Sequence, residues 1–209
     1  MLSSIRFKLL LFLVFIVILT GQPVFSLQID IPRGVFYYQP AASVFGSEAA
    51  WINPAGLGRY RNTSYQVMAD YFDGNYLKSW GTVMNKEGIG IAYRKLNNPI
   101  GEDYREYIFA SSVPVGGRVY LGGSYRYFKE GPGIYNKRHF WNIGLLGKEG
   151  NKISWGAVFS NLNRSKIDGV SSNIEQRYSL SYRPYGIKYS FSIDVITKKI
   201  LIQSVPKRI

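Results

Sequence analysis

The 209-residue chain contains no cysteine and only one histidine, His139. Without cysteine, neither a disulfide framework nor a thiolate site can form. A Ser-His-Asp or Cys-His site would depend on His139, and no Gly-x-Ser-x-Gly turn accompanies it. No histidine and carboxylate spacing suits a metal ion either. We therefore expect no enzyme activity, no catalytic residues, no metal site and no cofactor.

Acidic residues are scarce, with 13 Asp and Glu against 26 Lys and Arg, and the formal net charge is +13. The basic residues are scattered singly, without the interleaved aromatics of a nucleic-acid platform, so we expect no nucleic-acid partner. We interpret the charge as lumen lining and as contact with anionic lipid headgroups. Glu102, Asp103 and Glu106 gather near Arg105, and we predict that they lie in a solvated external loop.

Long apolar runs are also missing, apart from one that extends from Leu9 to Leu19. That run is shorter than the roughly 20 residues a membrane-spanning helix needs. Arg6 and Lys8 precede it, and small or tolerated residues follow it up to Ser26. This arrangement predicts a secretory signal peptide, residues 1–26, that is cleaved near Ser26.

What the chain does contain is a two-residue alternation of apolar and polar side chains, seen in 153–160, 177–183 and 187–195. The alternation predicts β-strands with one apolar and one polar face. The side chains expected to contact lipid are Ile153, Trp155, Phe159, Tyr189, Phe191 and Ile193. Those expected to face a lumen are Arg177, Arg183, Lys188, Ser190 and Asp194.

The alternation and its breaks place ten strands, at 62–72, 76–84, 88–96, 105–115, 118–128, 139–147, 152–161, 176–184, 187–196 and 200–205. Most have the 9–11 residues or so that cross a bilayer at a tilt. From the third strand onward, long connections at 97–104, 129–138 and 162–175 alternate with tight turns rich in Gly and Asn. Transmembrane barrels have this parity, with short periplasmic turns and longer external loops. The predicted fold is all-β, an antiparallel up-and-down transmembrane barrel of about ten strands.

Residues 34–58 do not alternate. Ala41 to Ala50 predicts a short helix of small residues, and Pro54 ends it while restricting Asn53 to an extended conformation. Gly56 and Gly58 would permit a sharp reversal before the first strand. We expect this helical plug to pack inside the lumen through its large apolar side chains, Phe45, Trp51 and Leu57.

The order of a signal peptide, a small-residue helix, the string Asn53-Pro54-Ala55-Gly56-Leu57 and amphipathic strands resembles the FadL-type outer-membrane family. This family includes long-chain fatty-acid transporters, aromatic-hydrocarbon channels and the PorV-like proteins of Bacteroidetes-type secretion. The resemblance covers 34–58 by motif and the rest by architecture. In the family, the Asn-Pro-Ala segment belongs to an N-terminal hatch that plugs the barrel. The resemblance implies that role for Asn53, Pro54 and Ala55, in a hatch of residues 27–60 before a barrel of residues 61–209.

Two features depart from the family pattern. The family normally has fourteen strands, and the last residues here, Val205 to Ile209, do not form the alternating strand with a terminal aromatic residue that usually closes such barrels. Two expectations remain open: a small ten-stranded variant, or part of a longer barrel.

Three functions follow as hypotheses. The first is the passage of hydrophobic small molecules through the plugged lumen of a barrel in a Gram-negative type outer membrane. The second is a PorV-like scaffold barrel that binds the proteins of a secretion or envelope complex. The third is a periplasmic β-sandwich that acts as a binding module.

Overall fold

The computed structural model describes residues 39–59, 62–72, 76–97, 103–129, 137–167, 170–171, 173–184 and 190–198. Several predictions from the sequence lie outside these ranges: the signal peptide, the hatch residues 27–38, the final strand at 200–205, and the side chains of Lys188 and Tyr189.

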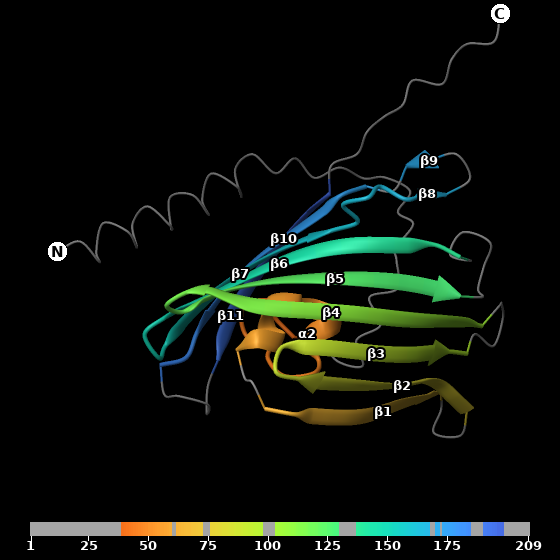
Figure 1. The fold of residues 1–209 in the computed structure, drawn as a ribbon, viewed down its shortest axis with the longest axis horizontal. Coiled ribbons are helices and arrows are strands. Elements are labelled where there is room, and N and C mark those ends of the chain that lie inside the picture. Colours follow the sequence, from red (N-terminus) through yellow and green to blue (C-terminus); the bar gives the residue numbers. More distant parts are fainter. Residues whose placement is uncertain are drawn as a thin grey trace, which may run out of the picture. The chain divides into compact units, whose positions relative to one another are not determined.

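One antiparallel sheet of nine strands dominates the described residues, and each strand pairs with the next in the order of the sheet (Figure 1). The strands are β1 (Ser64–Phe72), β2 (Tyr76–Lys86), β3 (Ile89–Leu96), β4 (Tyr104–Gly116), β5 (Val119–Lys129), β6 (His139–Glu149), β7 (Ile153–Ser160), β10 (Glu175–Tyr182) and β11 (Phe191–Lys198). The predicted all-β class and up-and-down antiparallel order are confirmed.

The strands differ from the prediction at two places. A small hairpin, β8 (Lys166–Ile167) with β9 (Val170–Ser171), lies inside the predicted loop 162–175. The predicted turn at Tyr185 and Gly186 is longer, because β10 ends at Tyr182 and β11 begins only at Phe191. Within the described ranges the sheet runs from β1 to β11 without a pairing between those two strands.

The connections divide the sheet into two rims. At the short-turn rim, β2–β3, β4–β5 and β6–β7 are joined by 87–88, 117–118 and 150–152. Glu87 and Gly88 both have positive φ, 53° and 91°, as a two-residue hairpin of type I′ requires. At the opposite, long-loop rim, the connections after β3, β5 and β7 span 97–103, 130–138 and 161–174.

Residues 39–59, here called the hatch segment, contain the two helical pieces of the described chain, α2 (Ala49–Ile52) and the 3-10 helix η1 (Pro54–Gly58). The helix predicted over Ala41–Ala50 is wrong: turns occupy its first part, and only its last residues join α2. Gly46 lies between them with a φ of +72°, which no right-handed helix contains. In the described part of the chain, no helix is long and apolar enough to cross a membrane.

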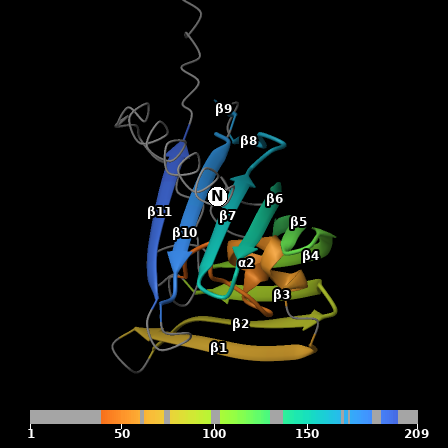
Figure 2. The same ribbon diagram turned by 90° about the vertical axis from the view of Figure 1, so that its left-hand side faces the viewer.

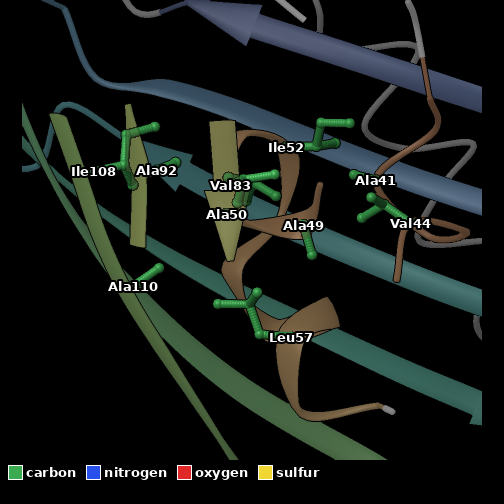
Figure 3. Packing of buried hydrophobic residues seen from close by; sticks show 11 residues of the cluster. Ala41, Val44, Ala49, Ala50, Ile52, Leu57, Val83, Ala92, Ile108 and Ala110 are labelled. Atoms are coloured by element: carbon green, nitrogen blue, oxygen red, sulfur yellow. The ribbon is translucent and has the colours of Figure 1, made fainter. Parts of the chain in front are cut away.

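The sheet curves around the hatch segment, which lies against its inner face (Figure 2). The hydrophobic core is the contact between the two (Figure 3). The hatch segment contributes Ala41, Val44, Ala49, Ala50, Ile52 and Leu57, and the strands contribute Val83, Ala92, Ile108, Ala110 and Val158. Most of these side chains are small, so the hatch backbone approaches the sheet closely.

The outer face of the sheet, which points away from the hatch segment, is apolar and exposed. Its exposed large side chains are Tyr65, Val67, Met84, Ile89, Ile91, Phe109, Val113, Leu121, Trp141, Ile143, Tyr182, Phe191 and Ile193. Phe109 is 54% exposed and its neighbour Ile108 is 1% exposed, so the two faces differ sharply within one strand. A patch of this extent on a water-exposed surface would be an aggregation hazard or an interaction site.

Aromatic rings gather on the outer face toward the long-loop rim. Tyr93, Tyr107 and Tyr127 lie directly opposite one another on β3, β4 and β5, with ring centroids 5.2 Å and 6.4 Å apart. Trp80 extends this row onto β2, 5.1 Å from Tyr93. Tyr125 and Trp141, 4.9 Å apart, continue it across β5 and β6.

Candidate functional site

Asn53 is the polar centre of the contact between the hatch segment and the sheet. Its φ of −147° and ψ of 102° are extended, as Pro54 dictates for the preceding residue, and its side chain is fully buried. The Nδ2 atom donates to the carbonyl oxygens of Ala41 and Leu145, each at 3.0 Å. The Oδ1 atom accepts from the amide of Ala55 at 3.1 Å. The Asn53 side chain therefore joins the first turn of the hatch segment, at Ala41, and η1, at Ala55, to β6.

Three inner-face glycines lie so close to the hatch segment that a Cβ atom at any of them would overlap it. We call Gly122, Gly144 and Gly156 the glycine floor. A Cβ atom on Gly122 would lie 2.3 Å from the amide nitrogen of Ala55, and one on Gly144 would lie 2.1 Å from Asn53 Oδ1. On Gly156 it would lie 2.8 Å from the Ala41 carbonyl oxygen. The hatch backbone thus occupies the space where side chains of β5, β6 and β7 would stand.

Gly58 serves the same close contact from the hatch side, and Gly56 allows close packing within the hatch segment. The sequence suggested that they permit a reversal, but both lie in η1 and neither has a positive φ. A Cβ on Gly58 would lie 2.6 Å from Ser112 Oγ, and one on Gly56 would lie 2.7 Å from the Val44 carbonyl oxygen. The lack of space for a Cβ atom, and not a need for positive φ, explains why glycine occupies these two positions.

Hydrogen bonds attach the hatch segment to strands across the whole sheet. Ser112 Oγ on β4 donates to the Ala55 carbonyl at 2.9 Å. The Ala42 amide donates to Ser179 Oγ on β10 at 2.9 Å, and Ser47 Oγ donates to Gln66 Oε1 on β1 at 2.9 Å. The hatch segment covers these polar groups of the inner face, and the hydrogen bonds give each of them a partner.

The three side chains predicted to anchor the plug differ in their burial. Leu57 is fully buried, and Trp51 is partly buried against the core. The packing predicted for Phe45 is wrong, because this side chain is 46% exposed. The Arg59 guanidinium lies 5.6 Å from the centroid of the Phe45 ring. Phe45 is therefore in a cation–π contact at the edge of the hatch segment.

The polar residues predicted on β10 and β11 lie on the inner face. Arg177 Nε donates to Asp194 Oδ2 at 2.7 Å, and Arg177 Nη2 donates to the Gln39 carbonyl at 2.9 Å. Beyond the end of β10, Arg183 Nη2 donates to the Ser43 carbonyl at 3.3 Å. These three side chains therefore contact the hatch segment or one another instead of lining open space.

The sequence did not reveal the most deeply buried charges. Glu106 was predicted in a solvated loop, but it lies on β4 with no exposure, and its Oε2 is 2.6 Å from Nη2 of Arg94. Arg126 contacts its other oxygen, so two cations share one carboxylate in an ionic triad. Alternation within β3 and β4 could have found it, because Arg94 and Glu106 are cross-strand partners on the face of Ala92 and Ile108.

An aromatic layer adjoins the ionic triad on the side of the long-loop rim. The rings of Tyr104 and Phe128 are 5.9 Å apart, and those of Phe128 and Phe140 are 5.8 Å apart. All three side chains are buried on the inner face. Along the strands, the inner face therefore carries the hatch segment near the short-turn rim, then the triad, then this layer.

Glu48 is the titratable group of the hatch segment whose pKa departs from its usual value. Burial raises the pKa, and a hydrogen bond with Gln66 partly offsets the effect. The folded state therefore holds the proton more tightly than the unfolded chain does. As pH rises through the raised pKa of Glu48, the carboxyl group ionises. The stability that the protonated group contributes to the packing of the hatch segment is then lost.

No family model, no curated protein and no solved structure matches this chain.

Gly122→Ala should loosen the hatch segment, because the new methyl group meets the backbone of Pro54 and Ala55, which cannot rotate away. We expect a loss of about 1–3 kcal/mol in unfolding free energy and faster hydrogen exchange in residues 39–59. Gly123→Ala is the matched control, since its Cβ would have only one neighbour within 4 Å, at 3.9 Å. Equal effects of the two variants would show that the glycine floor does not hold the hatch.

Glu106→Gln should destabilise the protein by about 3–5 kcal/mol, because Arg94 and Arg126 would then share the buried site without a carboxylate. Denaturant unfolding in detergent micelles measures the loss. Asp103→Asn removes a carboxylate from the exposed pair with Lys95, 3.4 Å apart, and should cost less than about 1 kcal/mol. If the triad lay in solvent, the two variants would lose similar amounts of unfolding free energy.

Proposed function

We propose that this chain forms the wall and the hatch of an outer-membrane β-barrel, and that hydrophobic small molecules cross its lumen when residues 39–59 move. The observation that carries the proposal is the division of the sheet into an exposed, largely apolar outer face and a mixed inner face that bears the buried polar groups and is covered by the hatch segment. In such barrels lipid covers the apolar face, and the polar face lines the lumen.

The outer face also carries an order of residues that suits a membrane boundary. Beyond the tyrosine row, one step closer to the long-loop rim, Lys95, Arg105 and Lys129 lie directly opposite one another on β3, β4 and β5. Like charges in such positions repel; Asp103 pairs with Lys95, and anionic lipid headgroups would offset repulsion that remains along the row. Tyrosine rings inside a cationic edge are the pattern expected where the hydrocarbon layer meets the headgroups.

This pattern counts against a periplasmic β-sandwich. A sandwich would turn the apolar face of its sheet inward and leave the polar face in water. Here the hatch segment covers the face that bears the buried polar groups, and within the described residues the large apolar side chains of the other face remain exposed. Lipid is the environment that would cover them at no cost in free energy.

The interior supports passage of apolar cargo. The aromatic layer of Tyr104, Phe128 and Phe140 lies on the inner face between the ionic triad and the long-loop rim. A molecule entering from that rim would meet these rings first, and the hatch segment would then block its way. Displacement of residues 39–59 is therefore the step that we assign to gating.

A scaffold role like that of PorV-like proteins is the second candidate, and the glycine floor favours it. The hatch segment fits the sheet at backbone level and bonds to β1, β4, β6 and β10. So close a fit suits a permanent plug as well as a gate. In that case the chain would bind other proteins of an envelope complex without conducting cargo.

Phe109→Arg tests the lipid-facing assignment, because a charge near the middle of a strand would be buried in hydrocarbon. We expect a loss of about 2–4 kcal/mol in unfolding free energy for protein folded into phosphatidylcholine vesicles. Val115→Arg, on the same strand beside the β4–β5 turn, should cost at most about 1 kcal/mol. If Phe109→Arg were neutral, this face would lie in water and the barrel proposal would be wrong.

A disulfide between the hatch segment and β3 tests gating. A Cβ on Gly90 would lie 3.6 Å from the Cβ of Ala50, within the range of about 3.5–4.5 Å found in disulfides. The chain has no other cysteine to interfere. The variant Ala50→Cys with Gly90→Cys should take up a fluorescent fatty acid several-fold more slowly when oxidised, and reduction should restore the rate.

Each single variant, treated with the same oxidant, is the matched control and should keep its uptake rate. If oxidised and reduced forms of the double variant took up the probe equally, motion of the hatch segment would not gate passage. That result would favour the scaffold role, since a disulfide does not change the behaviour of a plug that never moves.

A further inference from the structure

A cavity of about 250 Å³ lies at the short-turn rim, between the end of the hatch segment and the sheet. Its lining residues are Arg59, Arg118, Tyr120, Lys148, Gly150 and Asn151. We propose that this cavity binds a phosphate group, either as free phosphate or as the phosphodiester of a lipid headgroup. The inference does not require passage of cargo through the lumen, because it needs only the cavity and its charges, although Arg59 belongs to the hatch segment.

The charge of the lining is of one sign. Three of the six lining residues are cations, and no carboxylate lies among the described residues that line the cavity. Arg59, Arg118 and Lys148 come from three different elements, the hatch segment, the β4–β5 turn and β6. Three cations brought together repel one another unless an anion lies between them. The fold therefore concentrates positive charge where a bound anion would relieve it.

Local structure fixes the backbone positions from which these cations extend. Lys148 follows Leu146 on the inner face of β6, and its backbone amide donates to the Arg118 carbonyl at 3.1 Å. This bond ties the β4–β5 turn to β6. Arg59 comes directly after η1, and its guanidinium also contacts the Phe45 ring. Tyr120 is on the inner face of β5, beside Gly58, and a Cβ on that glycine would lie 3.3 Å from its ring.

The donors match the chemistry of phosphate. Two guanidinium groups offer planar, paired N–H donors, and the ammonium of Lys148 adds a point charge. Tyr120 and Asn151, which also line the cavity, carry a hydroxyl and an amide group that can act as neutral donors. A water molecule occupies about 30 Å³ in the liquid, so the cavity has room for a phosphate group and several waters. A tetrahedral anion with several oxygens can use donors that come from three sides.

The test uses the full chain purified in a nonionic detergent. Inorganic phosphate, titrated by calorimetry at constant ionic strength, should bind the native protein. Arg118→Gln and Lys148→Gln should each weaken this binding about tenfold, the effect of losing one charge-assisted hydrogen bond. Lys152→Gln is the matched control, since it removes a cation from the same turn as Gly150 and Asn151 but lies outside the cavity, and its affinity should not change.

Lipid headgroups are tested in the same detergent by native mass spectrometry. Phosphatidylglycerol should be retained in preference to zwitterionic phosphatidylcholine, and Arg118→Gln and Lys148→Gln should lose this preference. Specific binding of inorganic phosphate alone would assign a free anion, and specific retention of phosphatidylglycerol alone would assign a headgroup. The proposal fails if neither probe binds, or if Lys152→Gln weakens binding as much as the two cavity variants do.

Discussion

The contact between the backbone of the hatch segment and the glycine floor is the constraint on which the rest of the structure depends. It lets Asn53 reach a carbonyl of β6, and it lets Leu57 and the alanines of the hatch segment enclose the core. A side chain on Gly122 or Gly144 would push the two layers apart. The core would then lose contacts along its whole length, because its members are small and leave little room for adjustment.

The covered inner face explains how one sheet can carry such different sides. The inner face holds serines, the two buried asparagines Asn85 and Asn142, and the ionic triad, and these groups find partners in the hatch segment or in one another. The outer face carries large exposed apolar side chains over much of the sheet, with tyrosines and a cationic edge toward the long-loop rim. This division is what links the fold to the proposed place in a membrane, since it assigns each environment to one face.

A second division runs along the strands. The long-loop rim carries the aromatic layer inside, and tyrosines with a cationic edge outside. The short-turn rim carries the cation-lined cavity and the exit of the hatch segment. Alternation sets the faces of a strand, but position along the strand decides which rim a residue meets. The aromatic entry of the proposed passage and the proposed phosphate site therefore lie at opposite rims, and Arg59 connects the phosphate site to the hatch segment.

The sequence by itself determined the all-β class, the alternating faces and the extended backbone at Asn53, because two-residue periodicity and the restriction before Pro54 act between neighbouring residues. Only the tertiary structure decided that Glu106 is buried, that Phe45 is exposed and that three glycines support the hatch segment. These outcomes depend on strand register and on where residues 39–59 dock. Asn53 and Leu145 meet across 92 positions of sequence, and no local pattern contains that distance.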